Sequence, residues 1–296
     1  MHIQAFYHPP TFTLTYVVWS DASRAAVIID PVLDYDPASG NTDVTSADAV
    51  LRFIDEHGLR THFILETHAH ADHLSASQYL KRVTEAPVVI GSGIRTVQQG
   101  FKALLALNEN FRTDGSQFDR LVEEGEVLKA GELQVEIIAT PGHTPACVTY
   151  KIQDALFTGD ALFMDDYGTG RCDFPNGSAA DLYDSIQKLY AFPDETKVFV
   201  GHDYQPGGRA LVYETTIGRS KAHNPQLDGE TSKDAFVQAR EARDRELAAP
   251  RLLFPSVQVN IDAGHLPAPQ AEGRRYLKMP LNLLRAADEV GKPVPS

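Results

Sequence analysis

The chain has 296 residues, 43% of them hydrophobic, so it can form one large domain or two small ones with a sizeable core. Its net charge of −13 argues against a nucleic-acid partner, because neutralising phosphates requires clustered Lys and Arg. No apolar run approaches the roughly 20 residues that span a bilayer, and the N-terminus lacks a signal peptide, so we expect a cytoplasmic protein that binds no membrane.

The first hundred residues predict alternating strands and helices. Apolar periodicity and capping residues indicate, in chain order, strands over 11–19 and 25–31, a helix over 47–57, a strand over 62–66, a helix from Ser75 or Ser77 to Val83, a strand over 87–90 and a helix over 94–107. The first strand is expected to be half-buried and to pair antiparallel with the second. The stretch 34–42 is rich in turn residues and predicts a loop, and Ser46 is expected to cap the first helix.

The second part of the chain begins with short strands and continues with helices. In chain order we predict strands over 127–128, 133–139, 147–152 and 155–158, a helix over 178–189, a strand over 197–200, helices over 211–222 and 233–247, and an edge strand over 255–260. Leu281 to Leu284 are expected to pack back on the core. This order of elements predicts an α+β protein, a four-layer αββα sandwich. Residues 1–230 would form the catalytic domain, and residues 231–296 a helical or irregular C-terminal extension packed on it.

The stretch His68-Ala69-His70-Ala71-Asp72-His73 follows the strand predicted over 62–66. Imidazoles and carboxylates are common metal ligands, and this segment carries four of them within six residues. On a loop that leaves a strand, His68 and His70 point to the same side, whereas Asp72 and His73 turn away as the next helix begins. The segment can therefore serve one or two metal positions, although a histidine-rich surface loop is the ordinary alternative.

Three more ligand-type residues each follow a strand-like run that ends in glycine. They are His143, Asp160 and His202. Glycine lets the backbone turn sharply at the end of a strand, so these side chains are expected to face a common edge of the packed sheets. The sequence therefore offers seven candidate ligands in all.

These seven residues admit two allocations. Two metals that share Asp160 as a bridge would make a hydrolase, in which a metal-bound hydroxide attacks a thioester, lactone or phosphodiester. One metal held by His68, His143 and Asp160 would instead be a facial triad suited to a non-heme Fe(II) oxygenase. The other four residues would then orient the ligands and bound water by hydrogen bonds. The ligand count does not separate these allocations.

The H-x-H-x-D-H segment, followed by a single His, a single Asp and a last His, resembles the metallo-β-lactamase fold superfamily over residues 12 to 202. That resemblance implies the αββα sandwich of this type. The flanking segments look like the bacterial type of its persulfide dioxygenase branch, and they are residues 67–73, 141–145, 159–163, 170–174 and 201–204. This implies one Fe(II) per chain held by His68, His143 and Asp160, with zinc as the alternative metal. It also implies that glutathione persulfide, O2 and water give sulfite and glutathione.

The same resemblance implies that Arg171 and Tyr204 hold the glutathione moiety. By position alone, Arg171 is more often a surface or ion-paired arginine, and Tyr204 is equally a packing residue. Cys172 stands where we expect threonine in the animal enzymes, and the chain runs longer from about Ser232. The alternative function is a glyoxalase II-like thioester hydrolase with a dinuclear zinc or iron site, because its motifs are nearly the same. A catalytically silent metal-binding module is disfavoured, since every ligand position is filled.

Two further expectations concern the cysteines and the oligomer. Cys147 and Cys172 are the only cysteines, so no disulfide framework is expected, and both are interpreted first as packing residues. The C-terminal extension leaves a homodimer open, although no long apolar stripe demands one.

Overall fold

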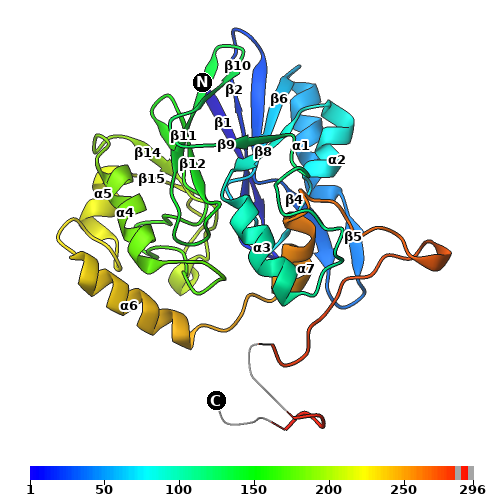
Figure 1. Cartoon of the computed structure of the whole chain (residues 1–296). Helices are drawn as coiled ribbons and strands as arrows, with labels where there is room; N and C mark the ends of the chain where they lie inside the picture. Colours follow the sequence, from blue (N-terminus) through cyan, green and yellow to red (C-terminus); the bar gives the residue numbers. More distant parts are fainter. Residues whose placement is uncertain (284–287, 293–296) are drawn as a thin grey trace.

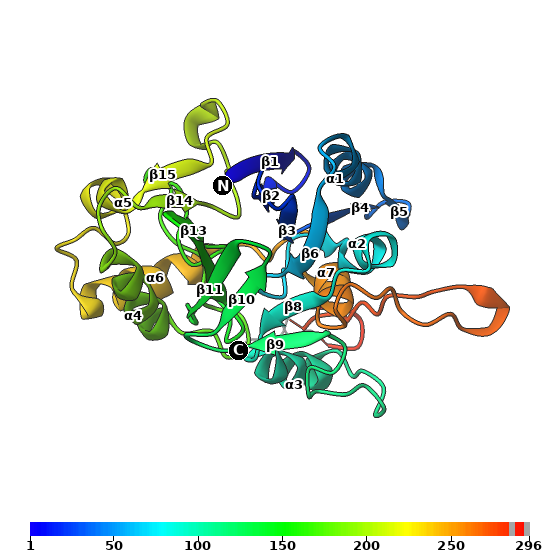
Figure 2. The same cartoon turned by 90° about the horizontal axis from the view of Figure 1, so that it is seen from above.

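The computed structural model describes residues 1–283 and 288–292. Two six-stranded sheets face each other, and helices cover the outer face of each sheet (Figures 1 and 2). The prediction of a four-layer αββα sandwich is therefore confirmed. Every helix among the described residues is too short or too polar to cross a lipid bilayer.

The first sheet has the strand order β1-β2-β3-β6-β8-β9. Its strands are β1 (His2–His8), β2 (Thr13–Trp19), β3 (Ala25–Ile29), β6 (Arg60–Leu65), β8 (Val88–Gly91) and β9 (Arg120–Val122). Four helices flank it, namely α1 (Thr45–Glu56), α2 (Ser77–Thr84), α3 (Ile94–Leu104) and α7 (Leu253–Asn260). Strands β3, β6, β8 and β9 run parallel, so the loops after β3 and β6 leave from the same edge.

The second sheet has the strand order β10-β11-β12-β13-β14-β15. Its strands are β10 (Val127–Ala130), β11 (Leu133–Ala139), β12 (Val148–Ile152), β13 (Ala155–Phe157), β14 (Lys197–Phe199) and β15 (Glu214–Thr216), and its helices are α4 (Ala179–Tyr190), α5 (Ile217–His223) and α6 (Lys233–Glu246). Strands β13 and β14 are parallel neighbours. The residues that follow them, Asp160 and His202, are thereby delivered to one edge.

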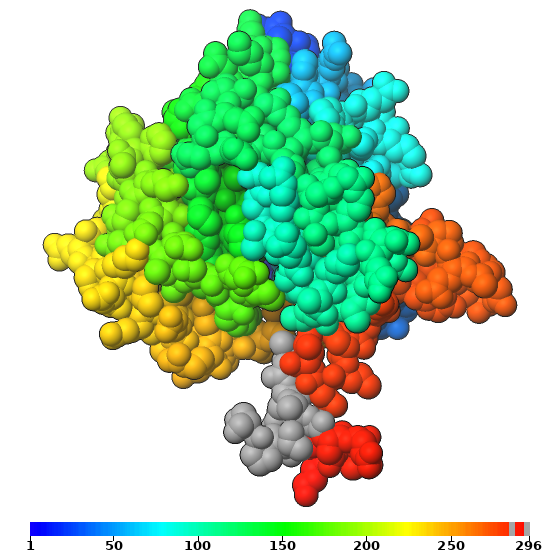
Figure 3. All heavy atoms as spheres, viewed as in Figure 1, coloured from blue at the N-terminus to red at the C-terminus, as the bar shows by residue number. Residues whose placement is uncertain are grey.

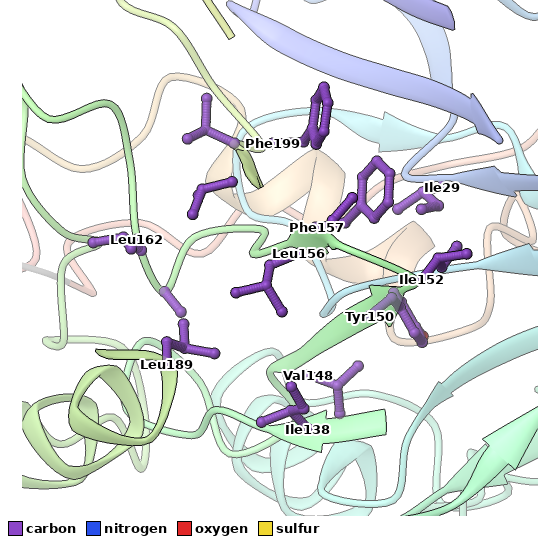
Figure 4. Packing of buried hydrophobic residues seen from close by; sticks show 14 of the residues in the cluster. Ile29, Ile138, Val148, Tyr150, Ile152, Leu156, Phe157, Leu162, Leu189 and Phe199 are labelled. Carbon is purple, nitrogen blue, oxygen red and sulfur yellow. The ribbon is translucent and has the colours of Figure 1, made fainter. Parts of the chain in front are cut away.

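Two buried tyrosines stand out in the core between the sheets. The Tyr16 hydroxyl donates to the carbonyl of Val200 at 2.7 Å, and the Tyr150 hydroxyl donates to that of Glu66 at 2.8 Å, so neither buried hydroxyl lacks a partner. Figure 4 shows how Tyr150 packs with the apolar side chains around β12 and β13. A second core lies between the first sheet and its helices. Because both faces of β2 are covered, the whole strand is buried, and the prediction that it is half-buried was wrong.

The predicted loop over 34–42 contains two short strands. Strands β4 (Val32–Asp36) and β5 (Asn41–Asp43) join β7 (Leu74–Ser75) in a small third sheet. Ser46 does not cap α1, because the helix already begins at Thr45. Instead the carboxylates of Asp34 and Asp43 accept from the first N–H groups of the helix, those of Ser46 and Thr45, each at 2.8 Å.

Two other predictions were wrong. The helix predicted over 211–222 is β15 followed by α5, because Thr216 adopts an extended backbone and caps the shorter helix by accepting from the N–H of Arg219. The edge strand predicted over 255–260 is part of helix α7, in which all six of these residues are buried. A helix that is buried on every side has no polar face, so its sequence lacks the period that would reveal it.

The C-terminal segment follows α7 along the surface. The part of this segment around the 3-10 turn at Ala271–Gly273 projects from the body of the molecule (Figures 2 and 3), and the chain then returns to α7, where Lys278 and Gln258 are hydrogen-bonded to each other. Leu281 was expected to pack on the core but is 84% exposed, and the end of that predicted contact, residue 284, lies outside the described residues. The division into two segments at residue 230 stays a prediction. Helix α6 packs on α4, with the rings of Tyr183 and Phe236 6.0 Å apart.

Candidate metal centre

The seven candidate ligands converge at the edge where the two sheets meet. They fall into two groups of neighbouring ligand atoms, here named the first position (His68, His143 and Asp160) and the second position (His70, Asp72, His73 and His202). The two carboxylate oxygens of Asp160 face different groups. One lies 3.5 Å from Nε2 of His143 and 3.9 Å from Nε2 of His68, and the other lies 3.4 Å from Nε2 of His202.

Glycine is required immediately before Asp160. Gly159 has a φ of +50°, and a Cβ atom there would lie 2.4 Å from Oγ1 of Thr67. Any other residue would strain the backbone and push the two strand-end loops apart. This explains why the Gly-Asp pair follows β13, and it supports the prediction that glycine aims these ligands at a common edge.

Hydrogen bonds fix the protons of both histidines in the first position. Nδ1 of His143 lies 2.7 Å from the carbonyl oxygen of Arg171, which can only accept, so Nδ1 carries the proton. Nδ1 of His68 lies 3.0 Å from the hydroxyl of Thr67, and that hydroxyl donates to Asp30 at 2.8 Å. Both Nε2 atoms therefore direct lone pairs at the carboxylate of Asp160.

This arrangement fits a bound cation. Two nitrogen lone pairs and a carboxylate oxygen repel one another unless a positive charge lies between them. Nε2 of His68 is buried and has no hydrogen-bond partner within the described part of the chain. Burial and the surrounding histidines lower the pKa of His68 well below its usual value, which keeps it in the neutral form that a metal needs.

His73 can also offer a lone pair, whereas the two carboxylates next to His70 favour its protonated form. Nε2 of His70 lies 3.1 Å from Asp30 and 3.3 Å from Glu66, and its Nδ1 has no partner among the described residues. Burial opposes the charged form of His70, yet the two carboxylates raise its pKa well above the usual value. Nδ1 of His73 contacts Asp72 at 3.3 Å, which leaves its Nε2 unpaired within the same residues. The rings of His68 and His70 lie 4.1 Å apart, so His70 stands between the two positions.

His202 differs from the other histidines. Its Nε2 lies 3.4 Å from both Asp72 and Asp160, whereas its buried Nδ1 has no partner in the described part of the chain. A metal-ligating histidine almost always donates its other ring N–H to an acceptor. Because His202 has no such acceptor, its proton is best placed on Nε2, where it bridges the two carboxylates.

A cavity of about 640 Å³ opens onto these ligands. Asp72, His143 and Asp160 line its floor, and aromatic side chains line its walls, namely Phe12, Tyr35, Phe163, Tyr167, Phe174 and Tyr204. This volume is in the range of pockets that enclose a small organic ligand. Arg171 and Tyr204, the residues predicted to hold the substrate, both line this cavity.

The guanidinium of Arg171 is already occupied. It forms a two-point ion pair with Asp173, with both contacts at 2.6 Å, and donates to the carbonyl of Ala248 at 2.8 Å. It also lies over the ring of Phe174. Arg171 thus fixes the cavity wall, and its predicted contact with substrate stays a prediction.

The Tyr204 hydroxyl has no hydrogen bond to the described residues, although the ring stacks on His202 at 5.5 Å and on Tyr167 at 4.8 Å. Burial raises its pKa well above the usual value, so the phenol is a neutral donor at the cavity surface. The predicted contact of this hydroxyl with substrate likewise stays a prediction.

Three residues of this centre were missed in the sequence. Asp30 holds the loop by accepting from the N–H and hydroxyl of Thr67 as well as from His70. Asn260 of α7 donates to the carbonyls of His70 and His73 at 2.8 and 2.7 Å. Glu66 accepts from two buried serines, Ser75 and Ser77. Asp30 could have been found in the sequence, because it is a polar residue at the end of a predicted strand. The residues around Asn260 give no such signal.

Comparisons with known proteins agree with this fold. The model of the metallo-beta-lactamase superfamily matches residues 8–202. A beta-lactamase hydrolase-like protein of Agrobacterium fabrum is 48% identical over 97% of this chain and 66% of its own length, and glyoxylase B2 of Dictyostelium discoideum is 44% identical over 96% and 98%. The human mitochondrial persulfide dioxygenase ETHE1 is 33% identical over 76% and 75%. A crystal structure of ETHE1 from Myxococcus xanthus matches with a TM-score of 0.72 and 34% identity, over 90% of this chain and 100% of that one.

The bacterial hydrolase-like relatives are longer than this chain. The chain spans 66% of the length of the Agrobacterium protein and of its Xylella fastidiosa counterpart. The identity to these relatives exceeds the identity to the persulfide dioxygenases, so the resemblance to that branch is the weaker of the two.

Proposed function

This chain belongs to the metallo-beta-lactamase superfamily, and on that premise we propose that it is a persulfide dioxygenase that oxidises glutathione persulfide at a single iron. The observation that carries the proposal is a difference in the hydrogen bonds behind the histidines of the two positions. Nδ1 of His68 and Nδ1 of His143 each have an oxygen partner, which leaves Nε2 free to bind a metal, whereas Nδ1 of His202 has no partner among the described residues. Two imidazoles and one carboxylate with open positions suit a non-heme Fe(II) oxygenase.

Bound by His68, His143 and Asp160, Fe(II) would supply the redox chemistry and the open positions for sulfur and dioxygen. In the overall reaction, glutathione persulfide, O2 and water give glutathione, sulfite and two protons. The aromatic walls of the cavity exclude bulk water from the sulfur. The Tyr204 hydroxyl, which keeps its proton, offers a hydrogen bond to the bound substrate.

The proposal is tested by metal analysis together with oxygen uptake. Freshly purified protein should contain about one iron per chain and consume O2 with glutathione persulfide, and sulfite should form in step with the O2 consumed. Two zinc ions per chain and no O2 uptake from the iron-loaded protein would overturn it.

A glyoxalase II-like thioester hydrolase with two metals is the second candidate. The printed names of the relatives at 44–48% identity support this reaction better than they support dioxygen chemistry. The position of Asp160 between the two groups of ligands supports it as well, because a bridging carboxylate suits a pair of metals. Hydrolysis of S-lactoylglutathione by protein loaded with two metals, with no O2 uptake, is the result that would favour this candidate.

A further inference from the structure

The outer wall of the cavity is built by the C-terminal extension. Helix α6 and the segment that joins it to α7 supply Arg240, Arg243, Leu247, Pro250, Arg251 and Leu252. The same cavity reaches His143 and Asp160, so the extension faces any substrate bound at the metal centre. No residue that was predicted to bind substrate comes from this part of the chain.

Two of the four arginines in the cavity wall are committed to structural contacts. Arg171 is held by Asp173 and by the carbonyl of Ala248. Arg240, which is 3% exposed, pairs with the buried carboxylate of Asp244. Arg171 uses all three of its nitrogens in these contacts, and the nitrogen of Arg240 that has no partner among the described residues, Nε, is buried, so neither guanidinium is available to a ligand.

The other two arginines, Arg243 and Arg251, have no such partners. Neither guanidinium forms an ion pair or a hydrogen bond within the described residues. The side chain of Arg243 lies over the ring of Tyr167, 6.0 Å from its centre, which keeps it on the cavity side of α6. Two unpaired cations at one cavity stand out in a chain with a net charge of −13.

Few acidic groups compete for these cations. Among the residues that line the cavity, Asp72 and Asp160 belong to the metal centre, and Asp36 is the remaining carboxylate. Asp36 accepts from the hydroxyl and N–H of Ser39 and from the N–H of Ala38, and it forms no ion pair with Arg251 within the described residues. Arg243 and Arg251 therefore form no ion pair with the carboxylates that line the described part of the cavity.

We infer that Arg243 and Arg251 form an anion subsite that binds a carboxylate of the substrate's peptide moiety. The inference rests on the proposed function for the identity of that moiety, since glutathione carries two carboxylates, but it does not depend on which reaction occurs at the sulfur. Arginine suits this role because its planar donors match a carboxylate. Arg171 is then the residue that holds Ala248, and with it the loop that leads to Arg251.

Binding of S-methylglutathione to the purified metal-loaded protein, followed by calorimetry, tests the inference without catalysis. The double variant R243Q/R251Q should raise the Kd roughly tenfold, in line with the loss of a charge-assisted contact at a half-open site. Binding to the wild type should weaken as salt rises, and binding to the double variant should respond less. In turnover, KM should rise more than kcat falls.

Arg245→Gln is the matched control, because Arg245 lies on the same helix but lines neighbouring cavities instead. It removes one charge from α6 and should leave the Kd unchanged. An S-methylglutathione ester, in which the glycine carboxylate carries no charge, shows whether the arginines contact this carboxylate directly or only attract the ligand through their long-range positive charge. The wild type should bind it about as weakly as the double variant binds the free acid.

Two outcomes would contradict the inference, and they differ. If the wild type binds S-methylglutathione and the double variant binds it equally well, the subsite is wrong and the proposed function stands. If the wild type does not bind S-methylglutathione at all, the assigned substrate class fails and the subsite fails with it.

Discussion

The two groups of metal-ligand side chains contain the same kinds of residue, yet they differ in the contacts behind them. In the first position, each histidine donates its outer N–H to an oxygen, which forces the inner nitrogen to carry a lone pair. In the second position, His202 lacks such an acceptor among the described residues and points its inner nitrogen at two carboxylates. The presence of ligand residues therefore does not fix the number of metals, because the hydrogen bonds behind them decide where the protons lie.

Removing a ligand from the first position should have the largest effect. His143→Ala deletes one of three ligands and also breaks the contact with the carbonyl of Arg171. We expect loss of the bound metal and a fall in activity of at least about 1,000-fold, more than the 10–100-fold that outer partners contribute. Metal content and O2 uptake measure both effects. Retention of a full equivalent of metal would contradict the role given to this position.

Asp30→Asn should have the next largest effect. This carboxylate accepts from both Thr67 and His70 and so orders one histidine of each position. An amide keeps the shape but loses the charge, so metal affinity should fall roughly 10–100-fold. Competition with a chelator gives the affinity. Asp36→Asn, which changes an exposed carboxylate at the cavity rim, is the control and should leave the metal affinity as it is.

The sequence predicted the ligands but not the contacts that distinguish them. Each ligand follows a strand end or a glycine, and that local pattern was sufficient to find His143, Asp160 and His202. The partners of these ligands come from distant segments. The carbonyl of Arg171 lies 28 residues after His143, and Asn260 is nearly 190 residues from the loop it holds. Every residue type has a main-chain carbonyl, so the sequence gives no sign of which carbonyl accepts from a histidine. The hydrogen-bond partners of the ligands therefore could not be predicted.

The fold could be predicted to a similar extent. Alternating strands and hairpins identified the inner strands of both sheets, because those patterns follow from which face of a strand is buried, but the edge strands β1, β9 and β15 were not predicted. The failures lie where packing overrides the local pattern. Helix α7 looks like a strand because it is buried all round, and β2 looks half-exposed although both of its faces are covered.

His202→Ala tests whether the second position binds a metal. If His202 serves only to donate a proton to Asp72 and Asp160, its removal should leave one iron per chain and reduce turnover by roughly tenfold or less. Metal analysis before and after dialysis against a chelator measures the stoichiometry. A drop from two metals to one would show that the second position holds a metal, and it would favour the hydrolase.

The smallest effect is expected at Cys172. Its neighbour Arg171 contacts His143 through the main chain, and its own N–H donates to Asp244 at 2.8 Å, whereas the thiol makes only a long contact of 3.9 Å with the carbonyl of Gly170, so the loop is held mainly by backbone contacts. Burial raises the pKa of Cys172 well above its usual value, and it raises that of Cys147 to about 12.

Both thiols should therefore stay protonated at pH 8 and react slowly with thiol reagents in the folded protein. Cys172→Ser should keep the metal and change activity by about twofold at most, as measured by metal content and O2 uptake. Asp244→Ala, which removes the acceptor of the backbone N–H and the partner of Arg240, should instead weaken metal binding. If the two variants lost metal equally, the thiol of Cys172 would help to hold the ligands of the first position. The backbone hydrogen bonds of this loop would then not be sufficient by themselves.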